Sequence, residues 1–326
     1  MRAELADIAR QIAESQQIAI LTHVSLDGDC LGSSIALGLE LRRLGKAVYV
    51  LTDAPIPGAL RFLPGKDLVI QALPDGFTYD MAIALDCGDK ERFQDRKKHF
   101  ALARVTANID HHGTNAGYAQ LNCVDKHSSS TAELVFELLK GMGAAITTDI
   151  AVCLYVGLVT DTGGFKYGNT NEATHICAAE LLGYGLNIAT LSQDIFVYET
   201  ESMLRLKARA LSSLRLEYDK RLAIVSVSMK DFADCQAEKS ETEGFADFGR
   251  ALPSVFASVA LREFEQDKIK ISMRSKGAYD VSRIAQKFNG GGHINAAGCS
   301  IDDTLENAIA RIIAAFEELK TYETSE

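Results

Sequence analysis

Four apolar stretches of this chain each end in acidic residues or histidines, and this pattern limits the folds that the chain can adopt. The residues that end the stretches are His23, Asp27 and Asp29, then Asp86, then Asp110, His111 and His112, and last Asp161. Short apolar runs are typical of buried strands in a parallel sheet. Because the carboxyl ends of such strands meet at one edge of the sheet, residues distant in sequence gather there. We therefore expect the four segments to lie at strand ends, or in the turns just after them, around one point.

The first part of the chain alternates between strand-like and helix-like segments. The expected strands are 17–22, 47–51, 67–70, 80–85 and 105–109, and the expected helices are 2–14, 30–44, 130–140, 148–159 and 171–182. This β-α-β rhythm predicts an α/β fold with a doubly wound, mainly parallel sheet.

The last third of the chain predicts a second, smaller α+β domain. The alternation is lost over 184–200, and 202–213 has the pattern of a connecting helix. Strand-like segments follow at 214–218, 221–228, 254–264 and 267–273, with helices at 280–288 and 303–320 and a mobile loop at 238–244. We therefore expect a first domain at 1–190, a connecting segment at 191–213 and a second domain at 214–326.

Length, charge and cysteine content restrict the class of protein. A chain of 326 residues with 47% apolar residues is long enough for two domains with sizeable cores. Its net charge of −10 argues against a protein that coats long nucleic acid, but not against small phosphorylated substrates. No apolar run approaches the roughly 18 residues that span a bilayer, and residues 1–15 lack the pattern of a secretory signal. Seven scattered cysteines without a Cys-x-x-Cys pair indicate reduced thiols, so we expect a cytoplasmic protein with no membrane partner.

The acids and histidines form a ligand set for two divalent metal ions. His23, Asp27 and Asp29 offer three ligand groups on one turn. Gly28 is expected to let the backbone bend so that both acids face inward. Oxygen and imidazole ligands without thiolate favour Mn²⁺ or Mg²⁺ over structural zinc. Two such ions clamp a phosphoryl group, normally with one bridging carboxylate, for which Asp86 is the candidate, so the set predicts a metal-dependent hydrolase of phosphate esters.

Each piece of this set also has an ordinary structural explanation. The His-x3-Asp-x-Asp segment alone is compatible with a solvated loop, tandem histidines often cap or pack, and Asp86 or Asp161 alone fits a helix N-cap. The combination, each member after an apolar run, favours the metal site. The residues expected to have only surface or packing roles are His99, His127, His175, Cys30 and Cys87.

A second group of residues, near the C-terminus, predicts an anion-binding site. Arg274 and Ser275 end a predicted strand, and Gly291, Gly292 and His293 belong to a glycine run that exposes backbone N–H groups. Between residues 250 and 300, eight Lys or Arg face four Asp or Glu, a local balance of +4 in a chain of −10. The run lacks the Lys-Ser/Thr of a P-loop, so nucleoside triphosphate hydrolysis is not expected. A flexible turn with ordinary solvated charges is the alternative.

These motifs together resemble the DHH phosphoesterase family, whose name-giving motif is matched by Asp110, His111 and His112. The resemblance covers nearly the whole chain, including the family's associated C-terminal domain. It implies one Mn²⁺ held by His23, Asp27 and Asp86 and a second held by Asp29, Asp86, His111 and Asp161, with Mg²⁺ or Co²⁺ as substitutes. It also implies catalytic roles for His112 and Asp110, and substrate contacts from Arg274, Ser275, Gly291, Gly292 and His293.

The form of the chain narrows the activity that the resemblance implies. A two-domain chain without sensor domains is similar to the stand-alone nano-RNases that also dephosphorylate 3′-phosphoadenosine 5′-phosphate (pAp). We therefore expect a Mn²⁺-dependent enzyme that degrades very short RNA, and also pAp or pApA, to mononucleotides. Its expected partners are short RNA and small phosphorylated nucleotides, not long nucleic acid, and the sequence leaves a homodimer open.

Other activities on this scaffold are the alternatives. Close relatives hydrolyse cyclic dinucleotides. An inorganic pyrophosphatase or polyphosphatase is a further alternative, but the C-terminal domain argues against it, because manganese pyrophosphatases lack the Gly-Gly-Gly-His element. RecJ-like exonucleases usually carry an additional oligonucleotide-binding domain. A non-catalytic nucleotide-binding protein would predict broken metal ligands, and the expected ligands are all present.

Overall fold

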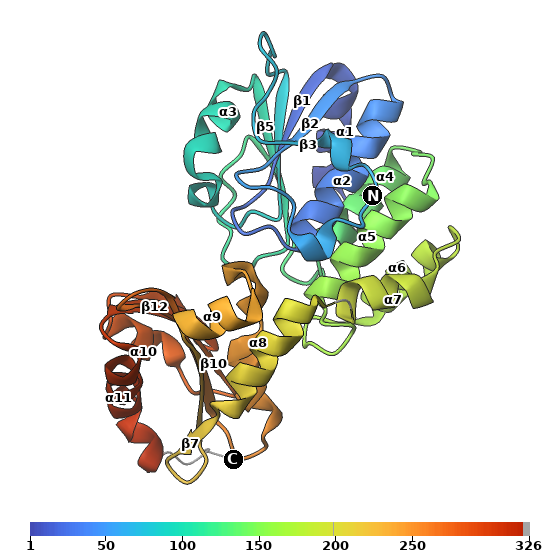
Figure 1. The fold of residues 1–326 in the computed structure, drawn as a ribbon. Helices are drawn as coiled ribbons and strands as arrows, with labels where there is room; N and C mark the ends of the chain where they lie inside the picture. The colour runs from blue at the N-terminus through green and yellow to red at the C-terminus, as the bar shows by residue number, and fades with distance from the viewer. Residues whose placement is uncertain (198, 322–326) are drawn as a thin grey trace. The chain divides into compact units, whose positions relative to one another are not determined.

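The computed structural model describes residues 1–197 and 199–321, and the chain divides into two compact units, Met1–Tyr198 and Glu199–Glu326 (Figure 1). Each unit has its own six-stranded sheet and its own hydrophobic core. The division falls within the segment 191–213, which the sequence predicts to connect two domains.

The sheet of the first unit is parallel, with the strand order β3-β2-β1-β4-β5-β6. Its strands are β1 (Gln17–Leu21), β2 (Ala47–Leu51), β3 (Val69–Ile70), β4 (Met81–Leu85), β5 (Val105–Asp110) and β6 (Leu121–Val124). The central strands β1 and β4 are almost wholly buried, as expected for strands covered on both faces. The order reverses direction between β1 and β4, which is where open sheets of this type bind their ligands.

Helices cover both faces of this sheet (Figure 1). They are α1 (Ala3–Glu14), α2 (Gly28–Arg43), α3 (Lys97–Leu102), α4 (Thr131–Gly141), α5 (Thr148–Asp161), α6 (Glu172–Leu182) and α7 (Ile188–Phe196), with the 3₁₀ helices η1 (Gly58–Leu60), η2 (Lys66–Leu68) and η3 (Lys90–Arg96). On β1, Ile18 and Ile20 join the core that includes α1, α2, α4 and α5. The alternate residues Ala19 and Leu21 pack on the opposite side with Phe93 of η3. The predicted doubly wound α/β fold is therefore confirmed.

Helices α2 and α5 approach each other closely because glycines lie at their contact. A Cβ on Gly32 would lie 2.3 Å from the carbonyl oxygen of Cys153. A Cβ on Gly28 would lie 2.3 Å from Oγ1 of Thr160. Gly28 is the first residue of α2 and has no positive φ, so the expectation that it bends the backbone is wrong. A glycine is required at position 28 because the start of α2 packs against the end of α5 there.

The second unit is built on a mixed sheet with the order β11-β12-β10-β9-β8-β7, antiparallel except for the parallel pair β8 and β9. Its strands are β7 (Arg215–Glu217), β8 (Leu222–Val227), β9 (Ala257–Glu265), β10 (Lys268–Ser275), β11 (Gly291–His293) and β12 (Ala296–Asp302). Its helices are α8 (Glu201–Ser212), α9 (Met229–Cys235), α10 (Val281–Gln286) and α11 (Leu305–Ala315), with the 3₁₀ helices η4 (Lys239–Thr242), η5 (Phe245–Ala251) and η6 (Glu317–Lys320). This is the predicted smaller α+β fold.

The structure corrects several predictions of local structure. The segment 184–200 contains α7, which begins after the N-cap Asn187. The expected mobile loop 238–244 contains η4, where Glu241 accepts hydrogen bonds from the hydroxyls of Thr200 and Ser202. Asp161 ends a helix and not a strand.

Two bulk features also appear in the structure. Over residues 1–197 and 199–321, no helix is long and apolar enough to cross a membrane. All seven cysteines are buried and free of disulfides, and Cys30 and Cys87 are fully buried, as the sequence predicts.

Candidate metal centre and anion-binding face

The candidate metal ligands gather where β1, β4 and β5 end. His23 follows β1 and Asp86 follows β4, and these adjacent strands flank the point where the strand order reverses. Asp110 is the last residue of β5 and leads into His111 and His112. Asp86 has a left-handed backbone with φ of 58°, a conformation that Asp adopts more readily than most residues with side chains. The topology therefore brings three loops to one edge of the sheet.

Asp86 stands between two imidazoles and directs one carboxylate oxygen to each. Its Oδ2 lies 3.3 Å from Nε2 of His23, and its Oδ1 lies 3.5 Å from Nε2 of His111. Nε2 of His23 is also 3.5 Å from the carboxylate of Asp27. Nδ1 of His23 lies 2.7 Å from the carbonyl oxygen of Val24, which fixes the ring and leaves Nε2 to face the acids.

The other two acids come from helices. Nε2 of His111 lies 3.6 Å from Asp161, the last residue of α5, and 3.9 Å from Asp29 in the first turn of α2. The oxygens of Asp29 accept hydrogen bonds from the backbone N–H groups of Thr131 and Ala132, at 2.7 and 2.8 Å. These N–H groups begin α4, where the helix dipole favours a negative charge. All six predicted ligands are therefore brought together.

Two residues that sequence reasoning did not assign also orient this cluster. The hydroxyl of Thr131 donates to Asp86 at 3.1 Å. The side-chain amide of Asn169 donates to Asp161 at 3.1 Å and to the carbonyl oxygen of Ser129 at 2.8 Å. The helix that Thr131 begins was expected from the sequence at 130–140, whereas no pattern in the sequence marks Asn169.

His112 belongs to a separate hydrogen-bonded chain beside the cluster. Its Nδ1 lies 2.7 Å from the buried carboxylate of Asp110. The side-chain amide of Asn115 donates to the other oxygen of Asp110 and to Asn108, both at 2.6 Å. The His112 side chain is 37% exposed, so its Nε2 remains available to a ligand.

The crowded charges shift the pKa values of this cluster. Burial and the neighbouring Asp86 raise the pKa of Asp29 well above its ordinary value, and burial raises the pKa of Asp161 to about 6. Burial opposes protonation of His111, but the hydrogen bond to Asp86 and the negative charges of Asp29, Asp161 and Asp86 together outweigh burial and raise the pKa of His111 to about 10. Burial also acts to raise the pKa of Asp86, but His111 and His23 hold that pKa below its ordinary value. Carboxylates this close repel one another, and a bound cation relieves that repulsion.

A thiol also lies within reach of this cluster. The sulfur of Cys30 forms a compact group with ligand atoms of His23 and Asp86. Burial raises the pKa of the Cys30 thiol well above its ordinary value, which disfavours the thiolate. The oxygen and imidazole donors therefore define the character of the site.

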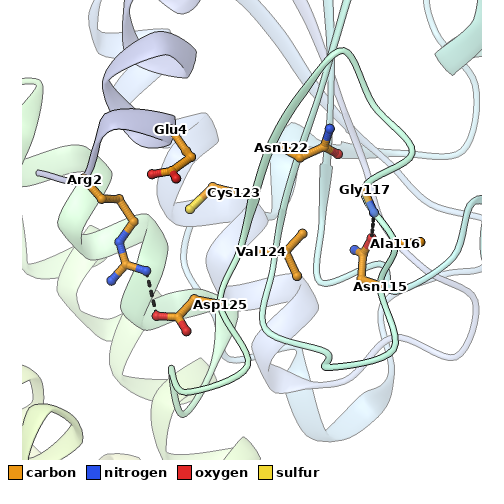
Figure 2. Close-up of a pocket in the computed structure, with 9 residues that line it drawn as sticks. All are labelled: Arg2, Glu4, Asn115, Ala116, Gly117, Asn122, Cys123, Val124 and Asp125. Carbon is orange, nitrogen blue, oxygen red and sulfur yellow. Dashed lines mark hydrogen bonds and ion pairs between the residues drawn. The ribbon is translucent and has the colours of Figure 1, made fainter.

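One cavity of the first unit lies apart from the candidate ligands. It has a volume of about 540 Å³, and Arg2, Asn115 and Asp125 are among the residues that line it (Figure 2). Arg2 pairs with Asp125 at 2.7 Å, and the side-chain Oδ1 of Asn115 accepts a hydrogen bond from the backbone N–H of Gly117 at 2.9 Å (Figure 2). None of the predicted ligands lines it, so we assign it no site.

Most of the predicted anion-binding residues lie on the sheet of the second unit. Arg274 is on β10 with a side chain that is 35% exposed, and His293 on β11 is exposed. The space around Gly291 is open. A Cβ on Gly292, whose φ is 145°, would lie 2.4 Å from the carbonyl oxygen of Ala296, so glycine allows β11 to approach β12.

Ser275 points away from this face. Its side chain is buried, and its hydroxyl donates to the carbonyl oxygen of Tyr279 at 2.6 Å and accepts from the amide of Asn295 at 3.0 Å. Because side chains alternate along a strand, Ser275 shares the core side with Met273, whereas Arg274 faces the other side. We therefore leave Ser275 out of the proposed substrate contacts.

Comparisons with known proteins agree with this two-part architecture. The chain matches the DHH family N-terminal domain over residues 17–158 and the DHHA1 domain over residues 223–321. It is 35% identical to the bifunctional oligoribonuclease and PAP phosphatase NrnA of Thermus thermophilus, over 92% of this chain and 89% of the relative. It is 30% identical to the protein of the same name in Bacillus subtilis, over 96% of this chain and 97% of the relative.

Solved structures also match both units of this chain. An exopolyphosphatase-related protein from Bacteroides fragilis matches with a TM-score of 0.91 and 31% identity, over 98% of this chain and 97% of that one. Exonuclease RecJ bound to manganese matches with a TM-score of 0.56 and 14% identity, over 98% of this chain and 95% of that one, which shows the fold alone. The fold and the relatives define a hydrolytic phosphoesterase. The chain belongs to the DHH family, as the sequence predicts, with a DHHA1 domain after the DHH domain.

Proposed function

We propose that this protein is a Mn²⁺-dependent phosphodiesterase and phosphatase of the cytoplasm that degrades very short RNA, and pAp or pApA, to mononucleotides. The observation that carries the proposal is the similarity, over nearly the whole chain, to two relatives named as oligoribonuclease and PAP phosphatase. The net charge of −10 supports short ligands over long nucleic acid.

The clustered donors of the first unit fit two divalent cations. The proposed ligands are His23, Asp27 and Asp86 for one ion, and Asp29, Asp86, His111 and Asp161 for the other. Carboxylate oxygens and imidazole nitrogens suit Mn²⁺, with Mg²⁺ or Co²⁺ as substitutes. The carbonyl oxygen of Val24 contacts Nδ1 of His23, and the hydroxyl of Thr131 donates to Asp86. These hydrogen bonds orient both donors. When bound, such ions polarise a phosphoryl group and make water a stronger nucleophile.

The chain's own acid–base group in this proposal is His112. Because its Nδ1 faces Asp110 at 2.7 Å, an ionised Asp110 keeps the proton on Nδ1 and directs Nε2 to the substrate. A protonated Nε2 is then placed to donate to the oxygen that leaves phosphorus. Asp110 acts through His112, so we propose it as a positioning residue, supported in turn by Asn115.

The second unit supplies the proposed contacts to the substrate's phosphate. Arg274 offers a charge-assisted hydrogen bond, and His293 adds an imidazole on the neighbouring strand β11. The open surface at Gly291, beside Gly292, lets an anion approach the backbone N–H groups.

The proposal is tested by measuring turnover of each substrate in one panel. The panel contains pyrophosphate, pAp, cyclic di-AMP, pApA and 5′-phosphorylated RNAs of graded length, each with Mn²⁺ after chelation of other metals. We expect release of mononucleotides from pApA and short RNA, and release of phosphate from pAp. Hydrolysis of pyrophosphate alone would contradict the proposal.

Cyclic-dinucleotide hydrolysis is the second candidate. The chain is 25% identical to the cyclic-di-AMP phosphodiesterase PdeA of Listeria monocytogenes, over 97% of this chain but only 50% of that relative. The panel separates the two activities, because a cyclic-di-AMP phosphodiesterase must turn over a substrate that has no terminal phosphate.

A further inference from the structure

Arg262, on β9, carries a positive charge, and its hydrogen-bond partners in the described part of the chain are neutral hydroxyls. Its Nη2 donates to the hydroxyl of Ser272, and its Nη1 lies 3.4 Å from Oγ1 of Thr242. The guanidinium lies 5.7 Å from the centre of the Phe264 ring. Its Nε is buried and has no hydrogen-bond partner among the residues that the structure describes. Within residues 1–197 and 199–321, Arg262 forms no ion pair with an acid, so its charge is not neutralised.

A second guanidinium lies near Arg262 on the same side of the sheet. The register of β9 and β10, together with strand alternation, places Arg262, Ser272 and Arg274 on one face. Burial and the positive charge of Arg274 both lower the pKa of Arg262. The acid nearest to Arg274 is Asp247 at 3.9 Å, and Asp247 already pairs with Arg250 at 2.8 Å. Asp247 therefore neutralises little of the positive charge of Arg262 and Arg274.

Two positive charges held together and partly desolvated are unfavourable unless an anion joins them. A groove of about 530 Å³ that an anion could enter runs along β10, β11 and β12, and Ser272, which Arg262 contacts, is among its lining residues. Its lining includes Lys270, Ser272, Asn289, Gly290, Gly291 and Gly298. Ser272 lines the groove and accepts the hydrogen bond from Arg262, so the partly buried guanidinium of Arg262 lies one side chain away from the groove.

We propose that Arg262 is a specificity-determining residue which, together with Arg274, makes this face select a terminal phosphate monoester over a phosphodiester. A monoester carries a charge of about −1.5 to −2 at pH 7, whereas a diester carries only one negative charge. Two uncompensated guanidiniums match the higher charge. Arg274 contacts the phosphate, and Arg262 acts through its charge and through Ser272. The inference rests on the proposed function, because it takes this face as the site of the substrate's phosphate.

Calorimetric binding to the full chain tests this selection without turnover. The probes are 5′-AMP and its methyl phosphate ester, which differ in the charge on the phosphate. We expect wild type to bind 5′-AMP at least about 10-fold more tightly, the lower end for one charge-assisted hydrogen bond. In Arg262→Gln the difference should fall below about threefold, and Arg262→Lys, which keeps the charge, should restore much of it.

Arg311→Gln is the matched control for this experiment. The Arg311 guanidinium also lies over a phenylalanine ring, at 5.6 Å from Phe288, but it has a carboxylate partner, Asp303, at 3.3 Å. This variant should keep the full preference for 5′-AMP. Turnover adds a second readout: the KM for pApA should rise in Arg262→Gln with little change in kcat, and comparison of pApA, ApAp and ApA identifies which terminal phosphate is selected.

Equal binding of the two probes by wild type would overturn the inference, even if Arg262→Gln does not fold. A preference for 5′-AMP that persists undiminished in Arg262→Gln would also overturn it, because the preference would then arise elsewhere, for example at the metal centre. If the preference depends on Arg262 but neither pAp nor short RNA is hydrolysed, the charge selection stands and the proposed function fails.

Discussion

At the scale of single residues, the proposed metal centre depends most on Asp86, because its two oxygens face different imidazoles. Asp86→Asn keeps the shape of the side chain but removes the charge that two ions would share. We expect loss of turnover and weaker binding of both Mn²⁺ ions by calorimetry. Asp89→Asn is the control, since Asp89 also follows β4 but only caps η3. Two sites of unchanged affinity in Asp86→Asn would show that Asp86 is not shared.

Thr131 offers a second test at this scale, because its hydroxyl donates to Asp86 at 3.1 Å while its backbone N–H serves Asp29. Thr131→Val removes the hydroxyl but keeps the side-chain shape and the N–H group. Outer hydrogen bonds of this kind are worth roughly 10- to 100-fold in metal affinity, so we expect Mn²⁺ binding at least about 10-fold weaker. Thr131→Ser should bind as wild type does. If both variants bind alike, the hydroxyl does not support the site.

At the scale of elements, the crossing of α2 and α5 positions Asp29 and Asp161, and Gly32 allows that crossing. Gly32→Ala places a methyl group against the Cys153 carbonyl, and overpacking of this kind costs about 1–3 kcal/mol. We expect the free energy of unfolding, measured in urea, to fall by that amount. Gly58→Ala is the control: nothing lies within 4 Å of its added Cβ, so its stability should change by less than about 0.5 kcal/mol. Equal stability of the two variants would contradict the close crossing.

The elements with strong periodicity were predictable, and those that depend on neighbours were not. Strand β4 is a short, wholly apolar run and β1 is apolar after Gln17, so their burial was visible in the sequence. Strand β6 has one buried side chain in four residues, and β11 consists of two glycines and a histidine, so their pairing depends on the strands beside them. Helix α7 was missed although Asn187 marks its N-cap and apolar residues recur through it, because the β-α-β rhythm had ended.

At the scale of the whole molecule, the convergence of His23, Asp86 and Asp110 was predictable because each lies at or just after the end of a strand that the sheet topology places. Asp161 follows an apolar run as well, but that run is helix α5, so its position depends on helix packing. Their support was not predictable from the sequence. The N–H groups that hold Asp29 come from α4, more than 100 residues away, and Asn169 reaches Asp161 through a loop without regular pattern. For Ser275 the expectation was a substrate contact, but its side chain faces the core of the second unit and donates to the carbonyl oxygen of Tyr279. The motifs therefore predicted which residues come together, and packing decided how their side chains are oriented.

The charge of the whole chain leads to a prediction about substrate length. The net charge is −10, whereas residues 250–300 carry a local excess of four positive charges. A long RNA therefore gains attraction only at that face and is repelled by the remaining surface. We expect kcat/KM to fall as RNA grows from two to beyond about five nucleotides, and to depend only weakly on salt because few phosphates are neutralised. Measurements on 2-, 5- and 20-nucleotide RNAs at two salt concentrations, with Asp86→Asn as the inactive control, test both expectations. Efficiency that rises with length and falls steeply with salt would require an extended basic binding surface, which contradicts the proposed preference for short substrates.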